Sequence, residues 1–180
     1  DVYHALPPAY TVDADGKPLH SWRTLILPYL EQKALYDKID LTKSWDDPAN
    51  AEAFKSRVEV YTCPSESLGE TKNLTTYMAV LTPTSCLRPM EARPLSDITD
   101  PLGSTLLVVE IRLEQAIPWM APHDADEAQF LSVGSDRRFV HVGGGHVAFV
   151  DGSVRFLNET ANADIKRALI SIAGGEPGDF

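Results

Sequence analysis

The chain has 180 residues, of which 43% are hydrophobic and 23% are charged. This composition fits one globular domain with a core of its own. The formal net charge of −10 argues against nucleic acid and anionic lipid surfaces as partners. No apolar run reaches the roughly 18 residues that a transmembrane helix needs.

The first residue is Asp1 rather than Met, and no signal peptide is recognisable in the sequence. The apolar Leu6-Pro7-Pro8 follows almost at once. We therefore expect the chain to be part of a longer protein.

The first third of the chain is predicted to contain a turn and three helical stretches. Acidic residues and glycine predict a turn at Asp13–Gly16. Ser21 is expected to cap a helix with an apolar stripe, which Pro28 should interrupt. Two further helices are predicted over residues 31–39 and 49–57, the second opened by an acidic cap and a proline.

The middle of the chain is predicted to alternate strands with long loops. Residues 58–63 and 75–81 indicate strands, and residues 82–104, with four prolines, indicate mostly loop. The β-branched and leucine-rich run at 105–111 is typical of a central strand buried on both sides. Residues 114–138 are predicted to form a long irregular loop, the kind that is often functional or mobile.

The strongest local signal is a hairpin around Asp151-Gly152. A two-residue type I′ turn there would join strands at 146–150 and 153–157. In that register Phe149 pairs with Val154, and one face of the hairpin becomes wholly apolar, comprising Val147, Phe149, Val154 and Phe156.

A last helix is predicted from Ala163 to Ala173, with Gly174 as its cap. Together these elements predict one α+β domain spanning residues 1–180. Its antiparallel sheet should contain residues 105–111, 146–150 and 153–157, with the helices packed on one side.

The sequence around the hairpin resembles a known family. His141, nine further residues and then Asp151-Gly152 match the H-x9-DG motif of bacterial prepilin-type, processing-associated proteins of unknown function. Other stretches resemble the same family in order along the chain: 6–10, 20–23, 27–32, 61–65, 98–100, 108–110, 118–119 and 147–157.

The resemblance implies a pilin-like or pseudopilin-like globular domain in which a helical stem lies on an antiparallel sheet. Family members usually begin with a prepilin leader and a long apolar helix, which would precede Asp1 here. The family has no agreed biochemical activity, and some of its labels point to solute binding. This chain departs from the usual pattern at Asp100–Ser104 and at Val142, where the family often has Asp-Gly-x-Ser-Asn and His-Pro-Gly-Gly.

The motif residues are predicted to be structural. If residues 141–151 are extended, the side chains of His141 and Asp151 lie on the order of 30 Å apart, too far for a catalytic dyad. We expect His141 to anchor its loop by bonding backbone or a carboxylate such as Glu110. The remaining motif residues, Gly143, Gly144, Asp151 and Gly152, are expected to form a close backbone approach and a turn.

The two cysteines, Cys63 and Cys86, leave two interpretations open. They form no C-x-x-C pair, which argues against a zinc knuckle or a thioredoxin-like redox site. They could form a disulfide in an oxidising compartment. Alternatively, they are two small buried hydrophobic side chains, which any compartment allows.

Ligand-binding candidates lie in the predicted loop 114–138. Trp119 is the best candidate for an exposed aromatic side chain, and the other candidates are His123, Asp124, Asp126 and Glu127. These acids suit weak binding of a hard cation or, alternatively, an ordinary solvated loop.

We therefore expect a non-enzymatic structural or surface protein, outside the cytoplasm and anchored in the inner membrane in its full-length form. Expected partners are further copies, or pilus-like or secretion-like machinery, reached through the N-terminal helix. No cofactor or metal is predicted. The alternative is a module that binds a solute, a glycan or a cation.

Overall fold

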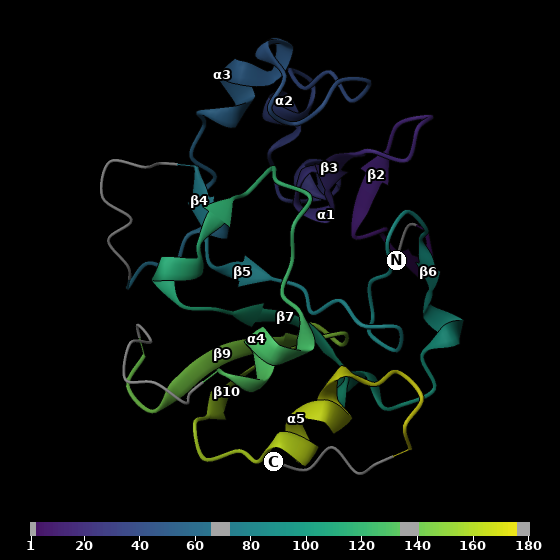
Figure 1. Ribbon diagram of the computed structural model, residues 1–180, viewed down its shortest axis with the longest axis vertical. Helices are drawn as coiled ribbons and strands as arrows, with labels where there is room; N and C mark the ends of the chain where they lie inside the picture. Colours follow the sequence, from purple (N-terminus) through teal and green to yellow (C-terminus); the bar gives the residue numbers. More distant parts are fainter. Residues whose placement is uncertain (1–2, 66–72, 134–140, 176–180) are drawn as a thin grey trace.

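A four-stranded antiparallel sheet forms the centre of the protein, of which the computed structural model describes residues 3–65, 73–133 and 141–175. Its strand order is β10 (Val154–Asn158), β9 (Gly144–Phe149), β7 (Leu106–Glu110), β5 (Tyr77–Met78). Short helices and two-stranded ribbons surround it (Figure 1). The α+β prediction is therefore confirmed.

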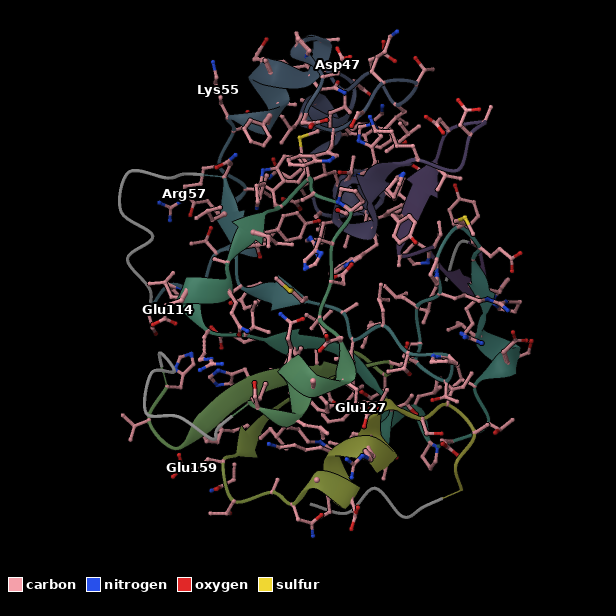
Figure 2. The ribbon with its side chains drawn as sticks, in the orientation of Figure 1. Asp47, Lys55, Arg57, Glu114, Glu127 and Glu159 are labelled. Atoms are coloured by element: carbon pink, nitrogen blue, oxygen red, sulfur yellow. The ribbon has the colours of Figure 1, made fainter. Side chains whose placement is uncertain are left out.

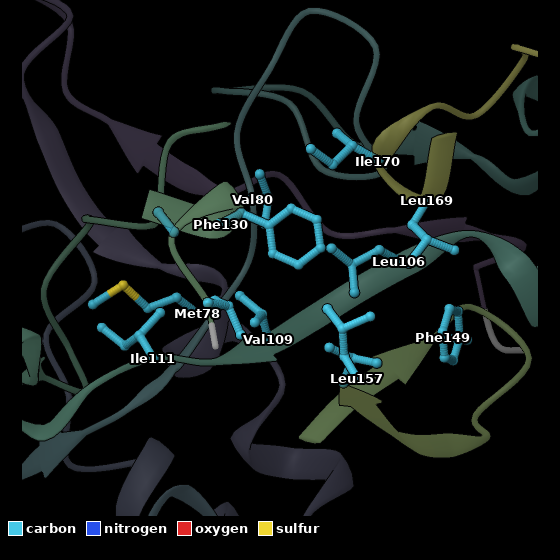
Figure 3. Close-up of a cluster of buried hydrophobic side chains, with 13 residues drawn as sticks. Met78, Val80, Leu106, Val109, Ile111, Phe130, Phe149, Leu157, Leu169 and Ile170 are labelled. Carbon is cyan, nitrogen blue, oxygen red and sulfur yellow. The ribbon is translucent and has the colours of Figure 1, made fainter. Parts of the chain in front are cut away.

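The main core lies on one face of this sheet. Leu106 and Val109 of β7 are at most 3% exposed, and the apolar run that contains them lies between two neighbouring strands, as predicted. Helices α4 (Glu127–Leu131) and α5 (Ala163–Ile170) place Phe130 and Leu169 on this face (Figure 3). Burial of such side chains stabilises the fold by roughly 1.5–3 kcal/mol each.

Side-chain caps begin both of these helices. Asp126 accepts a hydrogen bond from the Gln129 backbone N–H in a capping box, and Asn162 accepts one from Ile165. Helix α5 ends at Ile170, three residues before the predicted end, because the Ile172 carbonyl accepts hydrogen bonds from the backbones of Thr99 and Asp100.

The hairpin is present, but the predicted turn and register are wrong. Val154 pairs with Ala148 and Arg155 with Val147, so the loop has three residues, Val150 to Gly152. Gly152 has a φ of +85°, as the last position of a three-residue hairpin loop requires. The Val150 backbone N–H donates instead to Thr105 O at 3.0 Å, which draws Val150 out of the hairpin ladder.

A shift of one residue turns side chains to the opposite face of a strand. Val147 and Phe149 remain in the core, with at most 1% of their surface exposed. Val154 and Phe156 lie on the other face, 64% and 42% exposed. The second face of the sheet is therefore partly open.

The N-terminal half forms a layer of short elements. The predicted break at Pro28 is confirmed, because an α-helix ends at Leu25 and a 3-10 turn contains the proline. The elements are β1 (Ala5–Leu6) paired with β6 (Arg93–Pro94), β2 (Tyr10–Val12) paired with β3 (Pro18–Ser21), α1 (Trp22–Leu25), η1 (Leu27–Tyr29), α2 (Lys33–Tyr36), η2 (Pro48–Asn50) and α3 (Ala51–Phe54).

Two predictions for the middle of the chain need correction. Residues 58–63 are not a strand, because Glu59–Tyr61 forms the 3-10 helix η3. The predicted loop 114–138 contains β8 (Ile117–Pro118), which pairs with β4 (Leu74–Thr75), and helix α4. Residues 134–138 of that loop lie outside the described residues. The remaining elements are three short 3-10 helices, η4 (Leu95–Asp97), η5 (Leu102–Ser104) and η6 (Leu113–Gln115).

A buried arginine joins the N-terminal layer to the sheet. Arg23 is fully buried and forms an ion pair of 2.7 Å with Asp124, which is also buried. Its other hydrogen bonds go to the carbonyls of Tyr77, Trp119, Ala121 and His123, so all five guanidinium N–H groups have acceptors.

Charged side chains are spread over the outside of the molecule, including Lys55, Arg57 and Glu114 (Figure 2). Among the described residues, every helix is too short or too polar to cross a bilayer.

A matched pair of phenylalanine variants tests the observed register. We expect Phe149→Ala to lower the free energy of unfolding by about 3–5 kcal/mol, because the ring is fully buried. Phe156→Ala should cost clearly less, because 42% of that side chain is exposed. Urea unfolding of both variants measures the difference. Equal losses would support the register predicted from the sequence instead.

Candidate functional site

The candidate site is built around a carboxylate buried on the face of the sheet that points away from the main core. Glu110 ends β7 opposite Tyr77 of β5, and its side chain is only 3% exposed. Its Oε2 atom lies 3.2 Å from His141 Nε2 and 3.5 Å from His146 Nδ1. Its other oxygen, Oε1, is buried and has no hydrogen-bond partner among the described residues.

Both imidazoles come from the chain as it enters β9. His141 lies just before the strand, and His146 is its third residue, on the same face as Ala148. The two rings meet edge to face with centroids 4.4 Å apart, and Phe156 packs against His146 from β10. The histidines therefore support one another beside Glu110.

A cysteine thiol completes the cluster from the N-terminal layer. The Tyr61 hydroxyl donates to Arg23 O at 2.6 Å, which fixes η3 and the residues after it. Two residues on, Cys63 is 3% exposed and its Sγ lies 3.6 Å from His141 Nε2. Three segments far apart in the sequence thus bring donor atoms of Cys63, Glu110 and His141 within 4.8 Å of one another.

These groups line a hollow of about 460 Å³. Its walls are otherwise largely apolar and come from β5, β7, β9, β10 and the residues after η3. The lining consists of Cys63, Pro64, Ser65, Tyr77, Val108, Glu110, His141, His146, Val147, Ala148 and Val154. A carboxylate, an imidazole and a thiol in such a hollow can bind a cation or exchange protons.

The contacts do not have the geometry of a Cys-His-acid catalytic relay. In a relay the imidazole uses one nitrogen for the nucleophile and the other for the acid. Here the same atom, His141 Nε2, faces both Cys63 Sγ and Glu110 Oε2. The three groups converge on one another instead of forming a chain.

His141 and Asp151 do not meet. Asp151 lies exposed in the hairpin loop, where its carboxylate accepts the Ser153 backbone N–H at 2.8 Å and holds the turn. Hydrogen bonding by Ser153 is the main reason why the pKa of Asp151 is lowered. Strand β9 separates Asp151 from the hollow, as expected for a structural turn.

Comparison with known proteins identifies a family. Residues 1–138 match the sequence model of the family described as "Protein of unknown function (DUF1559)". The chain belongs to this family. No match was found among curated proteins or among solved structures.

The family match ends just before the H-x9-DG motif, which lies at 141–152. Cys63 and Glu110 fall inside the matched range, and the two histidines fall outside it. Within the motif, Gly143 has a φ of +87°, and Gly144 lies so close to β10 that a Cβ atom would meet Leu157 O. Gly143 thus allows the left-handed turn before β9, and Gly144 allows the close approach to β10.

Trp119 is not exposed, so this expectation was wrong. Its ring is 1% exposed, lies beside Tyr61 and donates its indole N–H to Ser56 O at 3.0 Å. Its backbone carbonyl accepts from Arg23 Nε. Trp119 belongs to a second hydrophobic core between the N-terminal helices and β8.

The acidic residues near Trp119 have separate structural contacts. Asp124 pairs with Arg23, Asp126 caps α4, and Glu127 forms an exposed ion pair with Arg167 at 2.8 Å. His123 is exposed, and its backbone carbonyl accepts from Arg23. They do not converge on a shared point, and in the described residues the grouping with metal-ligand spacing is Cys63, Glu110 and His141.

The two cysteines are both buried and are not joined in a disulfide. Burial raises the pKa of the Cys86 thiol to about 12, so this thiol stays protonated at neutral pH. Cys86 packs with Ile98 and Ile172 in a small apolar cluster of its own. Of the two, Cys63 is the one placed beside a carboxylate and an imidazole.

The sequence analysis named Glu110 as a partner of His141 but did not place Cys63 or His146 beside them. A glutamate at the end of an apolar strand was a readable signal of a buried charge. The approach of Cys63 was not readable, because it depends on the tertiary contact between Tyr61 and Arg23.

The two acids Asp124 and Glu127 should respond very differently to neutralisation. We expect Asp124→Asn to lower the free energy of unfolding by about 3–5 kcal/mol, since it leaves Arg23 buried without its counter-charge. Glu127→Gln should cost less than about 1 kcal/mol, because its ion pair is exposed. Denaturant titration of both variants tests this. Equally small losses of unfolding free energy in both variants would instead support the solvated acidic loop that the sequence analysis considered.

Proposed function

We propose that the chain is the displayed globular domain of a pilin-like surface protein, with no enzymatic activity. The observation that carries this proposal is the position of the motif residues. Asp151 and Gly152 form an exposed turn, Gly143 adopts a positive φ, and Gly144 packs closely against β10. These are scaffold positions, and they suit a domain whose work is to hold a shape.

The proposed mechanism is assembly and display. An apolar N-terminal helix preceding this domain in the full-length protein would anchor it in the inner membrane and leave it on the outer side. That helix would contact further copies, or pilus-like or secretion-like machinery. The acidic surface suits an extracytoplasmic domain that does not bind nucleic acid.

A second candidate function is glycan or solute binding, and a separate hollow favours it. This hollow, of about 770 Å³, is lined by Tyr3, Ala5, Leu6, Pro7, Pro8, Leu25, Ile26, Pro28, Tyr29, Tyr36 and Ala92. Tyr3 and Tyr29 are 73% and 56% exposed, and their hydroxyls lie 3.3 Å apart. Exposed aromatic rings with hydroxyl groups suit the apolar faces and hydroxyls of a sugar.

Cell fractionation of the full-length gene product tests the proposed function. We expect the full-length protein in the membrane fraction, with this domain degraded by protease added outside spheroplasts. Residues 1–180 expressed alone serve as the control and should stay in the soluble fraction. A full-length product that is soluble in the cytoplasm would exclude the proposal.

A thermal-shift screen against oligosaccharides tests the second candidate. If the tyrosine-lined hollow binds a glycan, one or more sugars should raise Tm, and Tyr29→Ala should abolish the rise. Val60→Ala removes a side chain of similar exposure, 50%, that does not line the hollow, and should leave the rise intact. No rise with any sugar would rule out glycan binding at this hollow.

A further inference from the structure

The buried carboxylate of Glu110 lacks a full set of partners. It is 3% exposed, its Oε2 atom faces two imidazoles, and its Oε1 atom has no hydrogen bond within the described parts of the chain. Burying a carboxylate without a compensating charge is costly. A bound cation would supply that charge.

The donor atoms are spaced like the ligands of a small tetrahedral metal ion. A zinc ion with bonds of roughly 2.0–2.3 Å places neighbouring ligand atoms roughly 3.3–3.6 Å apart. The observed separations are 3.6 Å from Cys63 Sγ to His141 Nε2 and 3.2 Å from His141 Nε2 to Glu110 Oε2. All three donors lie within 4.8 Å of one another.

The chemistry of the donors selects the class of ion. Calcium and magnesium take oxygen ligands, so a site that offers sulfur and nitrogen does not suit them. Thiolate, imidazole and carboxylate are the usual ligands of zinc. We propose that Cys63, Glu110 and His141 bind a zinc-class divalent metal ion. The sequence analysis predicted no metal site.

His146 is placed to assist this site. Its Nδ1 lies 3.5 Å from Glu110 Oε2, and its ring packs edge to face on that of His141. Rotation of the His146 side chain would make it the fourth ligand of the metal. Without that rotation, a water molecule in the hollow would take the fourth coordination position. Three protein ligands with one open position is a recognised zinc arrangement.

The metal would join separate parts of the fold. Cys63 follows η3 in the N-terminal layer, Glu110 ends β7, and His141 leads into β9. An ion held by all three ties the layer to the sheet. Its binding energy then becomes folding energy. This inference does not depend on the proposed surface display.

Isothermal titration of the 180-residue chain with zinc chloride, after treatment with a chelator and a thiol reductant, tests the proposal. We expect binding of one zinc ion per chain and a rise in Tm. Cobalt(II) in place of zinc should give the thiolate-to-metal charge-transfer absorption of a cysteine ligand and the visible bands of a tetrahedral site.

Two cysteine variants form the matched comparison. Cys63→Ser should weaken zinc binding by more than about 10-fold. Loss of a residue that only supports a metal ligand already costs at least about that much, and Cys63 is itself a proposed ligand. It should also remove the charge-transfer absorption. Cys86→Ser replaces a thiol of equal burial whose high pKa makes it a poor ligand, and should change neither.

Glu110→Gln provides a second variant that keeps the shape of the site. It should weaken zinc binding while circular dichroism of the metal-free protein shows an intact fold. The proposal is overturned if the wild-type chain binds no zinc. It is equally overturned if Cys63→Ser, folded by circular dichroism, binds zinc as tightly as Cys86→Ser.

Discussion

The rest of the structure depends on one buried cation, the guanidinium of Arg23. A fully buried arginine is tolerated only when its charge is balanced and its donors are used. Asp124 balances the charge, and four backbone carbonyls take the remaining N–H groups. Because these acceptors come from β5 and from the segment at 119–124, one side chain fixes the N-terminal layer against the sheet.

Two sets of contacts made by Arg23 position the residues of the candidate site. Arg23 donates to Tyr77 O on β5, and Tyr77 pairs with Glu110 on β7. The Arg23 carbonyl accepts the Tyr61 hydroxyl, and the chain reaches Cys63 two residues later. The carboxylate and the thiol thus meet His141 because both are positioned from the same residue. The helices in the described residues are short, so the geometry of the site comes from such contacts.

Local signals in the sequence predicted elements well and long-range neighbours poorly. The run at 105–111 became the interior strand β7, and Pro28 interrupted its helix, because both effects act within a few residues. The hairpin was found, but Asp-Gly suits two-residue and three-residue loops alike. The choice was made by Thr105, which takes the Val150 N–H and lies 45 residues away in the sequence.

The same distinction applies to the candidate site. The expected neighbour of His141, Glu110, is there, although the anchoring role itself stays a prediction. Trp119 was misread because a tryptophan in an irregular segment gives no sign of its burial. Its packing on Tyr61 and its bond to Ser56 are tertiary contacts. Only the structure shows that Oε1 of Glu110 has no hydrogen-bond partner among the described residues.

Crystals of the 180-residue chain grown with zinc, with diffraction data collected at the zinc absorption edge, test the central claim most directly. The account predicts one anomalous peak roughly 2.0–2.3 Å from Cys63 Sγ, a Glu110 oxygen and His141 Nε2. Anomalous peaks confined to surface carboxylates and the exposed His123, with none beside Glu110, would contradict it.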